Sequence, residues 1–157
     1  MKKKIVSICL TAMLIGGMSI TSIREVRAAE IKSIDGSLLT HEEESIGYNP
    51  KVTRGKDLLT GYSKCVKLEG GKIYAGGTTI AAQVVDSVQI GVLVERAKEE
   101  DKAWSYYDNW YKENKNTNRV MSNRTLSVEG GYYYRVRCTH AANSDVSSSF
   151  TDGIYID

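Results

Sequence analysis

The sequence predicts an all-β protein, a small antiparallel β-sandwich at residues 61–157, preceded by a signal peptide and a poorly structured extension. Two segments carry the fold prediction, because apolar and polar residues alternate along residues 88–94 and again along residues 132–138. A period of two is typical of a strand with one buried face. Short segments of this kind, separated by Gly, Asn and Asp turns in a chain with one proline, favour a sandwich.

Residues 1–28 have the three-part layout of a secretory signal peptide. Three lysines follow Met1, an uncharged and mostly apolar run covers residues 5–20, and a more polar stretch ends at Ala28. The apolar run is shorter than the about 20 residues that a membrane span needs. We therefore expect cleavage near Ala28, a secreted extracellular protein, and no membrane span in the mature chain. An uncleaved N-terminal anchor is the alternative.

The signal peptide also accounts for the positive charge of the chain. The full sequence has 21 Lys and Arg against 19 Asp and Glu, and residues 1–28 hold five of these bases and one of these acids. The remaining 16 bases and 18 acids give no basis for a clustered positive face of the kind that binds nucleic acid. We expect no nucleic-acid partner, and an unknown extracellular polymer or protein instead.

Residues 29–60 show neither a period of two nor a period of 3.6, and they are expected to form an extension or spacer. They contain the acidic run at residues 42–44 and the single proline, Pro50. A solvated charge run is the simpler interpretation of those acids than a cation site. One short ordered piece is expected around residues 57–59.

The second half of the chain is rich in aromatic residues. Ten of the thirteen that follow the signal peptide lie within residues 104–155. Segment 104–111 fits a strand or a helix, and its aromatic content favours the strand. Residues 129–131 predict a turn before the strand at 132–138, and a last strand is expected from about residue 148 to residue 156.

Part of the chain, about residues 62–156, resembles an uncharacterised family of short secreted proteins of Gram-positive bacteria. The matching segments are residues 73–79, 85–88 and 93–95, the pair Trp104 and Trp110, residues 116–117, and the most specific string, Gly131-Tyr132-Tyr133-Tyr134-Arg135-Val136-Arg137. The resemblance implies export and a small β domain, and it implies no established activity. The last string is also similar to the next-to-last strand of fibronectin type III and other immunoglobulin-like sandwiches, which is a resemblance of architecture.

The residue inventory argues against an enzyme. The chain has two histidines, His41 in the extension and His140 at a strand end. A Ser/His/Asp set can be assembled from Ser147, His140 and Asp145, but no nucleophile elbow accompanies it. No His and Cys residues have the spacing of a zinc site, and no run of oxygen ligands has the spacing of a calcium loop. We therefore expect no catalytic residue, metal or cofactor.

Tyr133, Arg135 and Arg137 form the candidate ligand-binding stripe. Their parity is opposite to that of the core-facing residues of the same strand, so they are expected to point toward solvent. Tyrosine and arginine supply stacking area, hydrogen-bond donors and charge on a rigid strand. An exposed member of residues 104–111 is expected to extend this surface. The alternative is a solvated face whose arginines pair with acids such as Glu95.

Cys65 and Cys138 follow the signal peptide, and an exported protein permits a disulfide between them. Cys138 shares the inward parity of its strand, whereas Cys65 is expected to point outward in a regular strand. Parity therefore weakens the disulfide without excluding it, since a bulge would reorient one side chain.

These observations predict an exported, non-enzymatic β-sandwich module that acts outside the cell by binding a surface polymer or protein. A small secreted antagonist of the bacteriocin or toxin type is one alternative, and an enzyme with a cryptic site is another. The slightly acidic mature chain has no basic amphipathic helix, which speaks against a membrane-directed antagonist.

Overall fold

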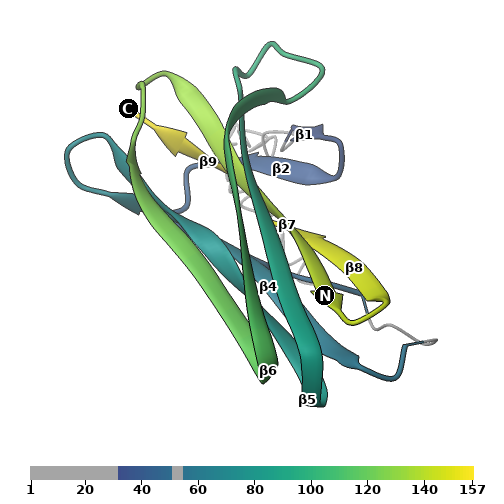
Figure 1. Cartoon of the computed structure of the whole chain (residues 1–157). Coiled ribbons are helices and arrows are strands. Elements are labelled where there is room, and N and C mark those ends of the chain that lie inside the picture. Colours follow the sequence, from purple (N-terminus) through teal and green to yellow (C-terminus); the bar gives the residue numbers. More distant parts are fainter. Residues whose placement is uncertain (1–31, 51–54) are drawn as a thin grey trace, which may run out of the picture.

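A computed structural model describes residues 32–50 and 55–157. The predicted signal peptide lies outside the described residues. No helix occurs in the described part of the chain, so none there is long and apolar enough to cross a membrane. The all-β prediction is confirmed. The strands are β1 (Ser33–Ile34), β2 (Ser37–Thr40), β3 (Glu44–Tyr48), β4 (Leu58–Leu68), β5 (Lys72–Ala97), β6 (Ser105–Ser127), β7 (Tyr132–Ala142), β8 (Asp145–Phe150) and β9 (Gly153–Ile156) (Figure 1).

A long antiparallel ribbon of β5 and β6 forms the frame of the fold. β5 has 26 residues and β6 has 23. Their pairing is interrupted between Ile80 and Val85, and there the ribbon bends sharply and turns back (Figure 1). On the β6 side of the bend, Asn116 has a φ of 49°, a conformation that asparagine adopts more readily than most residues. The bend gives the ribbon two arms.

Each arm of β5 has its own further neighbours. β4 pairs with the first arm and β3 pairs with β4, whereas β7 pairs with the second arm and carries β8 and β9. The described strands form one nine-stranded curled sheet, in place of the two separate sheets of a sandwich. The sheet is mixed and not purely antiparallel, because β2 and β9 run parallel.

The main core lies on the inner face of the folded sheet, and the predicted alternation supplies it. Tyr132 at the start of β7 packs half-buried against this core, and seven further inward residues of β5 and β7 are at most 2% exposed: Val88, Ile90, Val92, Val94, Tyr134, Val136 and Cys138. Each such buried aliphatic side chain stabilises the fold by about 1.5–3 kcal/mol relative to an exposed one. The prediction of inward parity along residues 88–94 and 132–138 is therefore confirmed.

The expectation of an irregular extension over residues 29–60 is wrong for residues 33–48. They form β1, β2 and β3, and β3 pairs with β4 from Glu44↔Val66 to Tyr48↔Tyr62. The regular part of the domain therefore does not begin at residue 61, and β4 itself begins at Leu58. Strands of two to five residues are too short to show a hydrophobic period, so only their long-range partners reveal them.

The β1–β2 hairpin covers part of the outer face of the sheet. Its two-residue turn is Asp35-Gly36, with φ of 48° and 79°, which suits a type I′ turn. Ile34 and Leu39 of the hairpin pack with Tyr133 of β7 in a second, smaller hydrophobic cluster. As a result, β7 is buried on both faces along Tyr133–Val136.

Candidate functional site

The residues of the predicted stripe lie on the predicted face of their strand, but two of the three are buried. Tyr133, Arg135 and Arg137 do lie on the outer face of β7, opposite Ala97, Glu95 and Leu93 of β5. However, Tyr133 is 6% exposed and Arg135 is 1% exposed. The prediction of a solvent-facing stripe is wrong for these two residues, because the β1–β2 hairpin and the loop before β6 cover them.

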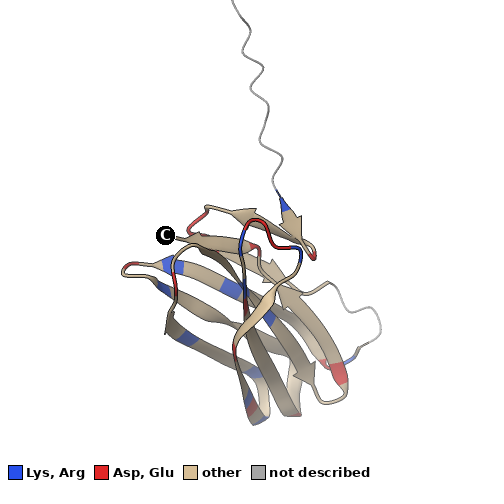
Figure 2. Ribbon diagram, turned by 90° about the horizontal axis from the view of Figure 1, so that it is seen from above, with Lys and Arg blue, Asp and Glu red and all other residues tan. Residues whose placement is uncertain are grey.

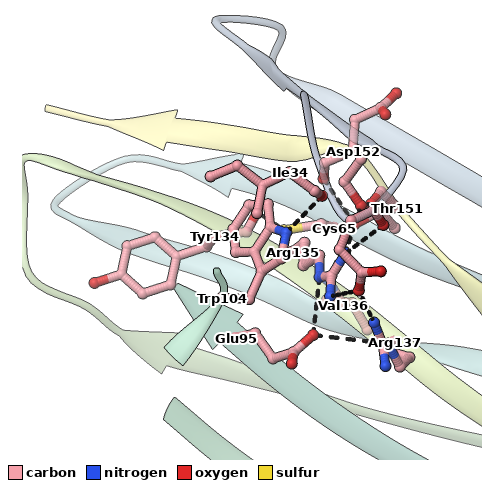
Figure 3. Close-up of polar contacts among 12 residues, drawn as sticks. Ile34, Cys65, Glu95, Trp104, Tyr134, Arg135, Val136, Arg137, Thr151 and Asp152 are labelled. Carbon is pink, nitrogen blue, oxygen red and sulfur yellow. Dashed lines mark hydrogen bonds and ion pairs between the residues drawn. The ribbon is translucent and has the colours of Figure 1, made fainter. Parts of the chain in front are cut away.

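Arg135 is the centre of a buried polar network (Figure 3). Its Nε donates to Glu95 Oε2 over 2.8 Å, its Nη2 donates to Asp35 Oδ2 over 2.9 Å, and its Nη1 donates to Ser37 Oγ over 3.0 Å. The guanidinium carbon lies 4.6 Å from the ring centroid of Trp104. A desolvated guanidinium requires such partners, so Arg135 holds the hairpin to the sheet and is not free to bind a ligand.

Arg137 is the member of the stripe that reaches the surface. Its side chain is 38% exposed, and its Nη2 donates to Asp35 Oδ2 over 2.5 Å. Hydrogen bonds from Arg135 and Arg137 hold the pKa of Asp35 below its ordinary value. Two arginines thus face two carboxylates, Asp35 and Glu95, and their charges balance.

Beyond Arg137, the outer face of the sheet is open and carries a hollow of about 430 Å³. Strand pairing arranges its wall residues in two rows across β6, β5 and β7. The first row is Asn109, Leu93 and Arg137, and the second is Tyr111, Gly91 and Thr139. The residues that line the hollow are Gly91, Val92, Leu93, Asn109, Trp110, Tyr111, Arg137 and Thr139.

Gly91 forms the floor of this hollow. A Cβ atom at this position would meet only Thr139 Cβ, at an ordinary distance of 3.9 Å, and Gly91 does not have a positive φ. Neither packing nor backbone conformation therefore requires glycine here. Glycine inside a strand is unfavourable and often marks a place where another group approaches closely. The missing side chain is what leaves the hollow open.

The side chains beside the floor are available for contact. Tyr111 is 59% exposed, and Phe150 of β8, which pairs with Arg137, is 42% exposed. Among the hydrogen bonds between described residues, none uses the side chain of Tyr111, Asn109 or Thr139. The hollow therefore combines one flat aromatic ring with uncommitted hydroxyl and amide groups.

A second exposed surface lies on the outer face of β3 and β4. It is an open depression of about 480 Å³ lined by Tyr62, Lys64, Val66, Leu68, Tyr74 and Glu44. The neighbouring Tyr48 is 67% exposed and contacts Tyr62, with ring centroids 5.7 Å apart. This surface lies beside the first arm of the ribbon, whereas the Gly91 hollow lies on the second arm. A substitution on one surface therefore leaves the other unchanged.

The Ser/His/Asp set assembled from the sequence is not formed. His140 is fully buried, and its ring nitrogens lie 2.8 Å from Thr79 Oγ1 and from Ser149 Oγ. Ser147 pairs with His140 across the ladder, but Asp145 accepts hydrogen bonds from the backbone of Asp57 and Leu58 instead. Within residues 32–50 and 55–157, no three His, Cys, Asp or Glu side chains are placed to hold a metal ion.

The two cysteines are free thiols in the structure. Cys65 and Cys138 are each fully buried, so the expectation that Cys65 points outward is wrong. The inward side of β4 carries small residues because β7 packs close to it: a Cβ on Gly61 would lie 2.4 Å from the His140 ring. Cys65 Sγ lies 3.8 Å from the carbonyl oxygen of Tyr134. Burial raises the pKa of both thiols to about 12.

Sequence reasoning named Arg137 but missed its neighbours in the hollow. Gly91 is the one signal that was available, since it interrupts a strand that is otherwise rich in branched residues. Tyr111 belongs to the aromatic segment singled out above. The register that sets Tyr111, Gly91 and Thr139 in one row depends on two strand pairings and cannot be read from any one segment.

No family model and no curated protein matches this chain. Among solved structures, the chain is similar to the solution structure of R. palustris CsgH. The two are 16% identical with a TM-score of 0.39, and the similarity covers 57% of this chain and 87% of that one. Similarity at this level supports no inference about activity or partner.

Proposed function

We propose that this chain is an exported, non-enzymatic β module that acts outside the cell by binding a surface polymer or a protein. The observation that carries this proposal is the hollow over Gly91, which strand β5 keeps open without a steric or conformational need. The layout of residues 1–28 supports export. The site residues named for the proposal are Gly91, Tyr111, Arg137 and Thr139.

The construction of the hollow favours binding over chemistry. Its walls stand on three paired strands, so their backbone is already ordered before a ligand binds. The charged side chain that lines the hollow, Arg137, is already paired with Asp35. The one buried histidine of the described residues lies on the inner face of β7 and is 0% exposed.

The test is a sedimentation assay with the protein as it is secreted and with surface and extracellular material from the producing cells. We compare the wild type with Gly91→Val, which fills the hollow with a residue that strands favour, and with Tyr111→Ala. The matched control is Tyr48→Ala, because Tyr48 is a tyrosine of similar exposure, 67% against 59% for Tyr111, on strand β3 beside the other arm.

Wild type and Tyr48→Ala are expected to sediment with the material, and the two hollow variants about tenfold more weakly or less still. Circular dichroism checks that every variant is folded. Wild type that stays in the supernatant contradicts the proposed function. Loss of binding in Tyr48→Ala, with Gly91→Val unaffected, would move the site to the outer face of β3 and β4.

A further inference from the structure

We infer that the Gly91 hollow receives a sugar ring of an uncharged polysaccharide. This inference rests on the proposed function and names the class of ligand. Three features of the hollow carry it: its charge is balanced, its walls combine an aromatic face with polar groups, and it is open at its sides.

Because the charges around the hollow are balanced, an ionic ligand would fit it less well than a neutral one. Among the described residues that line the hollow, Arg137 is the one that carries a charge, and it is matched within the network of Arg135, Asp35 and Glu95. A phosphate or carboxylate would compete with Asp35 for Arg137 and would gain little.

Several charges on the neighbouring part of β6 are paired as well, and Lys112 Nζ donates to the carbonyl oxygen of Met121. Glu113 contacts Lys115, and Arg124 Nη1 lies 3.6 Å from Asp108 Oδ2. Figure 2 shows Lys and Arg spread over several strands, with Asp and Glu among them. The described residues around the hollow therefore form no cluster of unpaired like charges of the kind that recognises an ionic polymer.

The side chains of the hollow match the two-sided chemistry of a sugar ring, which has C–H groups on its faces and hydroxyls around its rim. The exposed ring of Tyr111 offers a flat apolar wall. Thr139 and Asn109 offer a hydroxyl and an amide, which both donate and accept hydrogen bonds. A purely apolar ligand would bury these polar groups without partners, at a cost of about 1–3 kcal/mol each.

The dimensions of the hollow suit a unit inside a longer chain. Neighbouring strands lie about 4.8 Å apart, so the backbones beneath Tyr111 and Thr139, with Gly91 between them, are separated by about 10 Å. The volume of about 430 Å³ lies in the lower range of small-molecule pockets. The same outer face continues past Thr139 to Ser148 and past Arg137 to Phe150, which gives the next sugar units further exposed contacts.

The experiment is calorimetric titration of the secreted protein with short oligomers of glucose, mannose, galactose and N-acetylglucosamine. Oligomers of a uronic acid of the same length serve as the charged comparison. We expect binding to at least one neutral series, unchanged when salt is raised. Gly91→Val and Tyr111→Ala are expected to weaken it about tenfold or more, and Tyr111→Phe, which keeps the ring, to retain it.

Several outcomes would overturn the inference. They are absence of binding to all neutral oligomers, preference for the uronic acid series with salt sensitivity, and unchanged affinity of Gly91→Val. If the protein sediments with cell-surface material through the Gly91 hollow but binds no neutral oligomer, this inference fails and the proposed function stands. Capture of a protein from that material through the same hollow would also overturn the sugar inference and leave the proposed function standing. If it binds neither, both fail.

Discussion

Arg135 and Glu95 occupy paired positions on β7 and β5, and the Arg135 Nε donates to Glu95 Oε2 over 2.8 Å. Their side chains are 1% and 13% exposed, so the pair is almost fully removed from water. Asp35, which belongs to the β1–β2 turn, accepts a second bond from the same guanidinium. One side chain therefore joins the N-terminal hairpin to the middle of the sheet.

Replacing Arg135 by alanine is expected to lower the free energy of unfolding by about 3 kcal/mol, because the nearly buried Glu95 loses its hydrogen-bonded partner and keeps only Arg137 Nε, 3.7 Å away. Arg137→Ala is the control, since its side chain is 38% exposed and its loss is expected to cost less than about 1 kcal/mol. Urea denaturation measures both. An equal loss of unfolding free energy in the two variants would show that the contribution of Arg135 to stability does not depend on its burial.

Replacing Trp104 by alanine is expected to release the β1–β2 hairpin. The indole Nε1 donates to the Ile34 carbonyl over 2.9 Å, and the ring covers Arg135. Hydrogen exchange at residues 33–40 should accelerate in this variant, whereas exchange in the core of β5 should change little. Trp104→Phe keeps a ring but loses the hydrogen bond, which is worth about 1 kcal/mol. Its exchange rate at residues 33–40 should lie between those of the wild type and Trp104→Ala. Unchanged exchange at residues 33–40 would contradict this role.

Acidification is expected to destabilise the protein through His140. Burial lowers the pKa of this imidazole from its ordinary value of 6.5 to about 4. Between pH 6.5 and pH 4 the unfolded chain binds a proton that the folded protein does not bind. The free energy of unfolding therefore falls as the pH falls through this window, by about 3 kcal/mol in total.

The variants His140→Gln and His41→Gln test this assignment, with thermal unfolding measured at each pH. His140→Gln is expected to flatten the profile between pH 6.5 and pH 4, even if its stability is lower throughout. His41→Gln replaces the other histidine of the chain, which is exposed, and serves as the control substitution. A His140→Gln profile as steep as that of the wild type would assign the slope to other groups.

Cys65 and Cys138 are expected to react slowly with thiol reagents while the protein is folded. Both are fully buried, and burial raises the pKa of each thiol to about 12, so little thiolate is present. In denaturant without a reductant, both should be labelled fully. Mass mapping of the labelled peptides measures each cysteine separately. Unlabelled peptides joined by a disulfide would contradict the free thiols.

Export is expected to remove the first 28 residues. The protein recovered from the culture medium should begin at Ala29 or within a residue of it, as measured by intact mass. Protein that stays with the cells and begins at Met1 would support the membrane-anchor alternative.

The sequence by itself determined which residues of the two central strands face the core. Inward parity along residues 88–94 and 132–138 follows from a period of two, which is a local property of the chain, and the structure confirms it. Export and the absence of a nucleic-acid partner remain predictions that the described residues do not test.

Only the tertiary structure decided what covers the outer face of those strands. The sequence placed Tyr133 and Arg135 on that face correctly, but their burial depends on a distant hairpin, whose Ser37 lies 98 residues before Arg135. The pairing of β5 with β6 and β7 sets Tyr111 and Thr139 on either side of Gly91. No distant segment of the described chain covers these residues, so the hollow stays open. Local periodicity assigns a side chain to one face of a strand, whereas its exposure depends on which distant segments pack against that face.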